Sequence, residues 1–269
     1  MLGILFFVIS FFLVFSSSYF LMSIFREKKL VNSLIIFSMI FLSQIIVSME
    51  ALSLMKQINP VCTLGINIII FIFALGIFKY NKSPRIDFRD FSIAIKELMS
   101  AFKQDKVLIV LLVFFILSSL ISLFLAGFIP TNSGDALTYH LARVGFWLQH
   151  GTLAHYETSA IRQIVFPVNS EILILWPMIF LRHDYLATIN EYIAYCGCLM
   201  VLYGFLKYLK FSTRRTLWAI FILASLPAVI IESSSAQINL IWHFFYSAPY
   251  IYIYMELKKK ITSQYSFQP

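Results

Sequence analysis

Val107 to Ile129 reads VLIVLLVFFILSSLISLFLAGFI, a run of 23 residues without one charged side chain. An α-helix needs about 20 apolar residues to cross the hydrocarbon core of a bilayer, so this run is predicted to be a transmembrane helix. The whole chain has the same character, since 60% of its residues are hydrophobic and only 13% are charged. An ordinary soluble domain carries about 25% charged residues. Lipid is therefore expected to be the main solvent of this protein.

Six further apolar runs predict the rest of the fold, which we expect to be an all-α, polytopic membrane helix bundle with about seven transmembrane helices. The first run has no basic residue before it and no small-residue cleavage site, so we interpret it as a retained helix and not as a signal peptide. The six runs are Leu2–Phe25, Leu30–Met49, Val61–Phe78, Tyr185–Leu206, Thr216–Ile231 and Ile238–Met255.

The positions of the basic residues predict the orientation of the chain. With the N-terminus outside, the segments 26–29, 79–106 and 207–215 and the tail from residue 256 lie inside, and they hold 17 of the 21 Lys and Arg residues. Cytoplasmic loops are enriched in Lys and Arg, so this orientation is strongly favoured. The net charge of +8 then reflects topology and contact with anionic membrane lipid, and we expect no nucleic-acid partner.

Two shorter apolar segments are predicted to lie at the membrane surface. Ile172–Leu181 is about half a span long and contains Pro177, so we expect an interfacial or re-entrant helix in the outer loop. Residues 91–102 have apolar side chains at helical spacing, which predicts an amphipathic helix on the cytoplasmic leaflet. An ordinary short connector is the alternative for the second segment.

The outer loop, residues 130–184, is unusually long for a connection, and long loops are commonly functional. Residues 135–149 are predicted to form a helix, with Ser133 or Asp135 as its N-cap and Gly151 after its end. On a regular helix, Asp135 and Arg143 point within roughly 80° of each other, with His140 further round the same side.

The order of polar residues in this loop resembles the first outer loop of the GT-C glycosyltransferases. The likeness is nearest to the bacterial branch similar to protein O-mannosyltransferases and lipid A aminoarabinose transferases, and it covers roughly residues 107–256. It rests on Asp135 followed by Thr138-Tyr139-His140-Leu141, Arg143, Trp147 and Gly151, and then on Arg162-Gln163, Pro167 and Glu171.

The resemblance implies a glycosyltransferase that transfers a sugar from a polyprenyl-phosphate donor on the non-cytoplasmic face of a bacterial inner (plasma) membrane. Asp135 takes the place of the family's acidic residue, a general base on the acceptor or a positioning group. The cationic donors for the departing lipid phosphate are then His140, Arg143 and Arg162, and Glu171 is a further substrate-binding candidate.

A second outer loop of the family matches Ala236-Gln237-Ile238-Asn239-Leu240 here. Asn239 stands where the family has a second acidic residue with a metal-binding or positioning role. The resemblance therefore implies no definite cofactor, and a divalent cation is the one candidate that it leaves open. No Cys/His cluster with metal-ligand spacing is present in the sequence.

The resemblance divides the chain into three N-terminal helices with a basic cytoplasmic segment (1–106), a GT-C-like region (107–256) and a basic tail (257–269). Family members continue through further helices, so we expect an early C-terminal end and, for activity, a partner chain that supplies the missing helices. Two other interpretations stay open: a non-enzymatic protein that binds or transports lipid-linked sugar, and a nonfunctional fragment.

Each candidate residue also has a purely structural interpretation. Asp135 serves equally well as a solvated loop residue or helix cap, and Glu171 as a helix cap. Long basic side chains reach toward the membrane surface without binding a ligand. Trp147 and Trp176 are expected to be interfacial anchors. Glu191, inside an apolar run, is expected to face protein or water, and lining a cavity is its functional interpretation.

Overall fold

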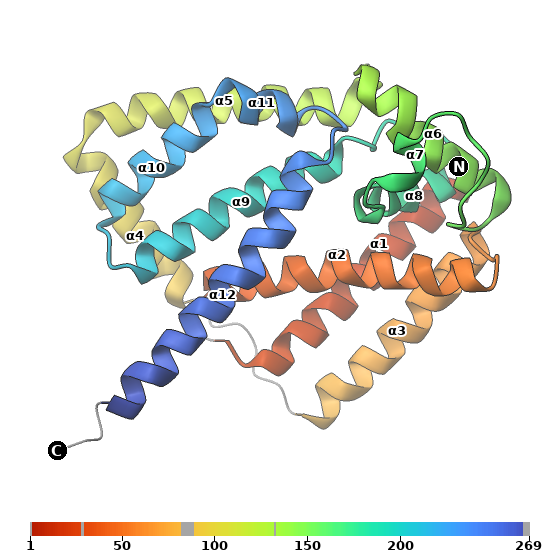
Figure 1. The fold of residues 1–269 in the computed structure, drawn as a ribbon. Helices are drawn as coiled ribbons and strands as arrows, with labels where there is room; N and C mark the ends of the chain where they lie inside the picture. The colour runs from red at the N-terminus through yellow and green to blue at the C-terminus, as the bar shows by residue number, and fades with distance from the viewer. Residues whose placement is uncertain (1, 28–29, 82–88, 132, 266–269) are drawn as a thin grey trace.

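The computed structural model describes residues 2–27, 30–81, 89–131 and 133–265, and these residues form helices joined by turns, with no strand among them. The all-α membrane bundle predicted from the sequence is confirmed. Most of the long helices run side by side between two ends of the molecule (Figure 1).

Five helices are long and apolar enough to cross a membrane, and α5 is the one least buried by other parts of the protein. Its exposed face carries large apolar residues such as Val110, Leu117 and Phe124, as expected for a lipid-facing surface. The five are α1 (Leu2–Met22, extended by the 3₁₀ turn η1, Ser23–Phe25), α2 (Leu30–Leu54), α3 (Pro60–Tyr80), α5 (Lys106–Phe128) and α9 (Ile189–Tyr208).

By length and apolar composition the described residues give five spans, or six if one bent pair is a span, where about seven were predicted, and the difference lies in the last two runs. The run Thr216–Ile231 is not one helix: α10 (Thr213–Ser225) and α11 (Pro227–Ser233) meet at an angle of 69°. Pro227 has no N–H to donate and disfavours helical backbone at Leu226, so the helix breaks there. The pair makes at most a sixth span. The seventh run lies in α12 (Asn239–Tyr265), which is long enough but not apolar enough to be counted.

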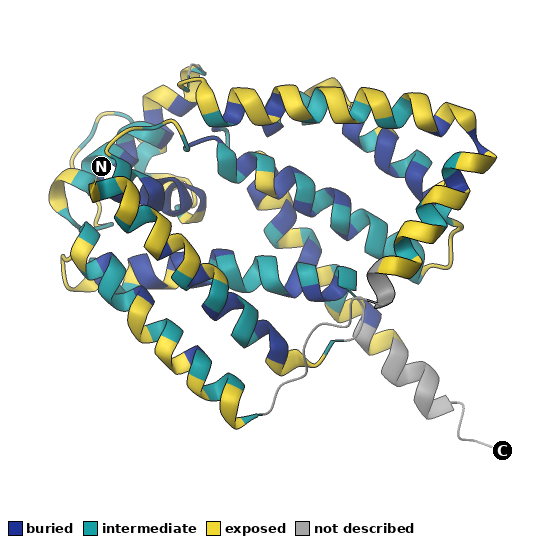
Figure 2. Ribbon diagram, turned by 180° about the vertical axis from the view of Figure 1, so that it is seen from behind, coloured by how far each residue is buried: buried dark blue, intermediate teal, exposed yellow. Residues whose placement is uncertain are grey.

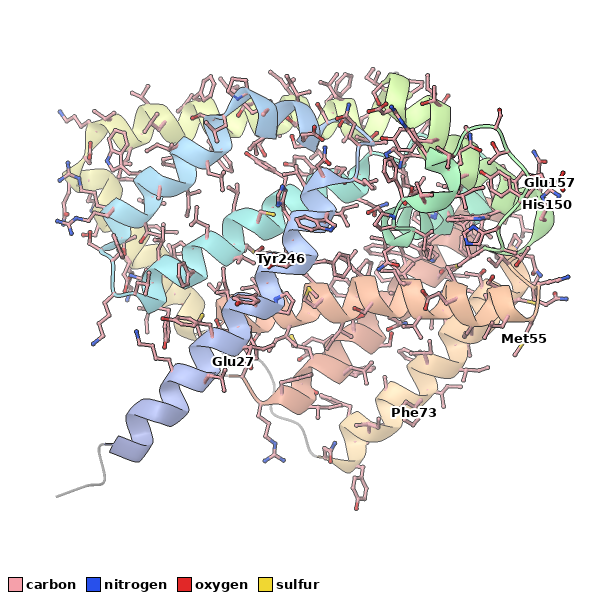
Figure 3. The ribbon with its side chains drawn as sticks, viewed as in Figure 1. Glu27, Met55, Phe73, His150, Glu157 and Tyr246 are labelled. Atoms are coloured by element: carbon pink, nitrogen blue, oxygen red, sulfur yellow. The ribbon has the colours of Figure 1, made fainter. Side chains whose placement is uncertain are left out.

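The connections gather at two ends of the bundle. At the end that we call the loop end, the N–H of Ile58, between α2 and α3, donates to the carbonyl of Gly151 in the long loop. At the other end, which we call the basic end, Lys207 of α9 bonds to Glu97 and Arg214 of α10 bonds to Asp105. His150 and Glu157 mark the loop end in Figure 3. This arrangement agrees with the alternation of loops on which the predicted orientation rests.

The predicted amphipathic helix 91–102 lies within α4 (Arg89–Gln104). In Figure 1, α4 runs across the basic end, at a steep angle to α5 and α9. Its apolar side packs on α10, where Ala101 shares a small core cluster with Leu217 and Phe221. Helix α4 is therefore fixed to the bundle on one face and leaves Ile93, Ile95 and Met99 exposed.

The short helix α8 (Asn169–Leu181) is a core element, so of the two expected placements, interfacial or re-entrant, the interfacial one is wrong. Ten of its thirteen residues are buried, and it packs between α1, α2 and α6 at the loop end (Figure 2). Trp176, expected as an interfacial anchor, is also buried, and its indole Nε1 donates to Ser10 Oγ at 3.0 Å. The same hydroxyl accepts from Asn67 Nδ2 at 2.8 Å, so α1, α3 and α8 meet at one polar contact.

The N-terminal three helices share one hydrophobic core with the rest of the chain. Residues of α2 such as Ile45 and Met49 belong to the same buried cluster as residues of α8, α9 and α12. Helices α9 and α12 approach closely in this core, where a Cβ added to Gly197 would lie 2.7 Å from the Phe244 ring. The core therefore fixes the position of the long loop that lies above it.

Candidate functional site

The long outer loop begins with a π-helical turn, η2 (Ala136–His140), and continues as α6 (Leu141–His150). The N–H of Leu141 bonds to the carbonyl of Ala136, five residues earlier, which adds one residue to the turn. Ser133 Oγ accepts from the N–H of Ala136, so Ser133 caps this turn and Asp135 does not. Gly151 ends α6 with a left-handed φ of 65°, as predicted.

The extra residue in the turn changes which side chains share a face. Single π turns inside helices are rare and are often found at functional sites. His140 and Arg143 point into the protein and are 1% and 0% exposed, whereas the Asp135 side chain is 52% exposed. The helix expected over 135–149 is confirmed, but the π turn makes it irregular, and the expectation that its three polar residues share one side is wrong. The predicted site residues fall into a buried group and a surface group.

The buried group joins α6 to α8 through Glu171. Glu171 Oε1 lies 2.9 Å from His140 Nδ1 and 3.1 Å from Arg143 Nη1, and none of the three side chains is open to solvent. Buried ion pairs are stable only when their remaining hydrogen-bonding groups are also satisfied. The donors of Arg143 are satisfied, whereas Glu171 Oε2 and His140 Nε2 are buried without a hydrogen-bond partner among the described residues.

Arg143 also holds the segment that follows, including α7 (Arg162–Val165). Its guanidinium donates to the carbonyls of Arg162, Gln163 and Phe166, and it lies 5.7 Å from the centre of the Trp147 ring. Trp147 is 2% exposed, so it is a core residue and not an interfacial anchor. With its donors directed at these carbonyls and at Glu171, Arg143 acts in this structure as a clamp on residues 162–166.

The surface group is the pair Asp135–Arg162. Arg162 Nη1 lies 3.5 Å from Asp135 Oδ1, and the side chains are 63% and 52% exposed. The Arg162 guanidinium also lies over the Tyr139 ring, 5.8 Å from its centre. Burial raises the pKa of the Tyr139 hydroxyl, and the neighbouring Asp135 carboxylate raises it further. The pair therefore presents one carboxylate and one guanidinium to solvent above a protonated tyrosine.

Gln163, quoted above as part of a motif but not chosen as a site residue, holds the loop together. Its Nε2 donates to the carbonyl of Thr138 at 2.8 Å, and its Oε1 accepts from Tyr156 and Thr158. This network fixes the segment of Arg162 against the segment of Asp135. In the sequence, the one sign of this role was that Gln163 stands next to Arg162 in the same motif.

A pocket of about 220 Å³ lies between the first and second outer loops. Its floor is apolar, with Leu125 and Ile129 from the end of α5 and Ile231 from α11. Its polar lining comes from both loops: Thr131, Ser133, Thr188, Ser234, Ser235 and Gln237. Of these polar residues, only Gln237 belongs to a motif quoted from the sequence. The others lie close together only because the two loops contact each other in the fold.

Of the two candidates in the second outer loop, only Gln237 lines this pocket. Asn239 is exposed and begins α12. The start of α12 is held by Glu191, whose Oε2 accepts from the N–H of Leu240 at 2.9 Å. Glu191 faces protein, one of the two surroundings expected for it: it is 1% exposed and caps a neighbouring helix.

The described residues contain no group of three or more His, Cys, Asp or Glu side chains placed to hold a metal ion. The charged neighbour of Asp135 is the cation Arg162, and the second-loop position is an amide, so these residues do not fit a divalent cation.

The chain matches no protein-family model, no curated protein and no solved structure in the comparisons made with each.

Proposed function

We propose that this chain is a membrane glycosyltransferase that takes its sugar from a polyprenyl-phosphate donor at the loop end. The observation that carries this proposal is the solvent-exposed Asp135 carboxylate, 3.5 Å from Arg162, on a loop clamped by the buried Arg143–Glu171 pair. A general base must be reachable by the acceptor, and the Asp135 side chain, 52% exposed, meets this condition.

In the proposed step, the acceptor hydroxyl oxygen attacks the anomeric carbon of the donor sugar. The new bond joins that oxygen to the anomeric carbon, the bond from this carbon to the phosphate oxygen breaks, and the hydroxyl proton moves to Asp135. The departing phosphate takes the bonding electrons as negative charge, and Arg162 stabilises it. Arg143 and Glu171 are positioning residues, since they are buried below the pair.

The pocket between the outer loops supports a donor of this kind. Its hydroxyl and amide lining suits a sugar, and its floor of Leu125 and Ile129 continues into the lipid-facing surface of α5. At about 220 Å³ it is smaller than the roughly 300–1,000 Å³ pockets of drug-sized ligands, as a single sugar unit requires. The polyprenyl chain would then lie along α5, in the bilayer.

The proposal includes an orientation, with the loop end outside the cytoplasm and the basic end inside, in a bacterial plasma membrane. One observation favours a second function, binding of lipid-linked sugar without transfer: the second-loop position is Asn239, and Glu171 is buried, which leaves Asp135 as the single exposed carboxylate of the matched pattern.

The test is sugar transfer from a polyprenyl-phosphate-linked sugar in proteoliposomes, with the wild-type chain, Asp135→Asn and the control Glu157→Gln. Glu157 is an exposed carboxylate at the same end, outside the Asp135–Arg162 pair. Loss of a general base lowers the rate by about 10²–10⁴-fold, so Asp135→Asn is expected to lose transfer and the control to keep it. Transfer that survives Asp135→Asn contradicts the proposal. Donor binding by wild type without transfer favours the binding function.

A further inference from the structure

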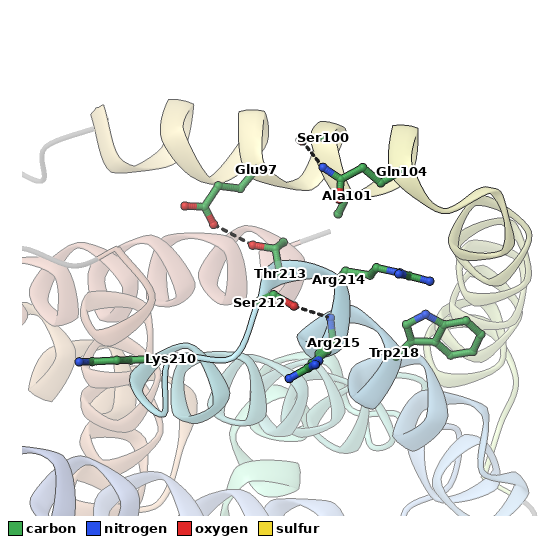
Figure 4. A pocket seen from close by; sticks show the side chains of 10 residues that line it. All are labelled: Glu97, Ser100, Ala101, Gln104, Lys210, Ser212, Thr213, Arg214, Arg215 and Trp218. Atoms are coloured by element: carbon green, nitrogen blue, oxygen red, sulfur yellow. Dashed lines mark hydrogen bonds between the residues drawn. The ribbon is translucent and has the colours of Figure 1, made fainter.

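A pocket much larger than the one between the outer loops lies at the opposite, basic end. It has a volume of about 880 Å³ and lies between α4 and the start of α10. Figure 4 shows α4 along one side, Arg214, Arg215 and Trp218 on the first turns of α10, and Lys210 at the other rim. None of the proposed glycosyl-transfer residues lines it.

Three cations and one carboxylate line this pocket. The carboxylate, Glu97, is already bonded to Lys207 and Thr213, and Arg214 is bonded to Asp105 just outside the lining. Lys210 and Arg215 are exposed, and within the described residues neither side chain forms an ion pair. The pocket therefore has an excess of positive charge that the surrounding protein does not neutralise.

The remaining polar groups of the pocket suit an anion with several oxygens. Ser100, Ser212 and Thr213 supply hydroxyls, and the N-terminal turn of α10 adds the positive end of a 13-residue helix. Guanidinium groups and hydroxyls together are the usual donors to phosphate oxygens in proteins. A carboxylate ligand has fewer oxygens than this set of donors can bind.

The pocket also lies where a lipid headgroup would be. Asp105 precedes the membrane helix α5, whose first residue, Lys106, is exposed and is followed by the exposed apolar residues Val107, Ile109 and Val110. On its other side, Glu97 also lines a second, mainly apolar pocket of about 300 Å³ formed with Val31, Ile93 and Tyr203. A polar, cationic pocket next to an apolar one matches the two parts of a phospholipid.

We propose that the pocket between α4 and α10 binds the phosphate group of an anionic phospholipid, which fastens α4 to the membrane end of the bundle. The phosphate lies by Arg215 and the first turn of α10, and Lys210 adds attraction from the rim. The binding chemistry is that of phosphate, which a free phosphate ion shares, so the experiment separates the two sources.

The experiment uses the full-length protein in detergent and native mass spectrometry, with phosphatidylglycerol, phosphatidylcholine and inorganic phosphate as probes. The variant is Lys210→Gln/Arg215→Gln. The matched control is Arg26→Gln/Lys79→Gln, which removes two exposed cations from the same end but outside the pocket. Unfolding midpoints of both variants in lipid-free detergent check that each one is folded.

We expect wild type and control to retain phosphatidylglycerol in preference to phosphatidylcholine, and the pocket variant to bind it about tenfold more weakly. This is the loss expected when a hydrogen bond to a charged group is removed. If millimolar inorganic phosphate displaces phosphatidylglycerol, the site is one for free phosphate, and the inference that it binds a phosphate group still holds. Equal losses in variant and control, or no preference of wild type for phosphatidylglycerol, would overturn the proposal.

Discussion

Arg143 Nη1 lies 3.1 Å from Glu171 Oε1, although the two residues are 28 positions apart and both side chains are closed to solvent. This contact fastens α6 to α8, and through the other donors of Arg143 it also holds residues 162–166. The exposed Asp135–Arg162 pair depends on it, because Arg162 belongs to the clamped segment.

Arg143→Met is expected to destabilise the protein strongly, because it leaves the Glu171 carboxylate buried without its cation. Breaking a buried pair in this way costs about 3–5 kcal/mol. Arg162→Met is the matched control, since its exposed ion pair contributes at most about 1 kcal/mol. Unfolding midpoints in detergent measure both, and equal midpoints for the two variants would show that Arg143 is not the clamp.

Gly197→Ala is expected to lower stability by about 1–3 kcal/mol through overpacking. The new methyl group would lie 2.7 Å from the ring of Phe244, which is 1% exposed and cannot move into solvent. Gly76→Ala in α3 is the control, because nothing lies within 4 Å of the added Cβ. If the clash is the cause, Phe244→Leu should recover part of the loss in the double variant, and a purely additive double variant would contradict this cause.

Protonation of the Asp105 carboxylate is expected to lower the stability of the folded protein in acid. The Arg214 guanidinium, and then the Trp218 indole, bond to this carboxylate and hold its pKa below the ordinary value. The folded state thus favours the ionised form, so its contribution is complete above about pH 4 and disappears as the pH falls through the lowered pKa.

Unfolding midpoints between pH 7 and pH 3 measure this contribution, with Asp105→Asn as the comparison. The variant should be less stable than wild type at neutral pH, and the difference should shrink toward pH 3. A difference that stays constant with pH would show that the ion pair with Arg214 is not its source.

The proposed orientation predicts opposite accessibility at the two ends. In a Cys62→Ser background, Glu157→Cys should react in intact cells with a membrane-impermeant maleimide, because it lies exposed at the loop end. Lys210→Cys, exposed at the basic end, should react only after the membrane is permeabilised. Labelling of Lys210→Cys and not Glu157→Cys in intact cells would reverse the orientation.

Much of the fold was predictable from local sequence, because lipid permits few structures. The uncharged run Val107–Ile129 is long enough to span and becomes α5, and the amphipathic spacing of residues 91–102 becomes α4. Gly151 ends α6 since it takes a left-handed φ without strain. These features depend on neighbouring residues alone, and a single sequence contains that information.

Tertiary structure decided which polar side chains meet. The π turn at 136–140 separated Asp135 from His140 and Arg143, and no periodicity in the sequence marks where such a turn adds its residue. Burial of Glu171 and of helix α8 depends on α1, α2 and α6, which are distant in the chain. Apolar runs thus indicate membrane helices by their length, but whether lipid or protein covers a helix depends on the packing of the whole bundle.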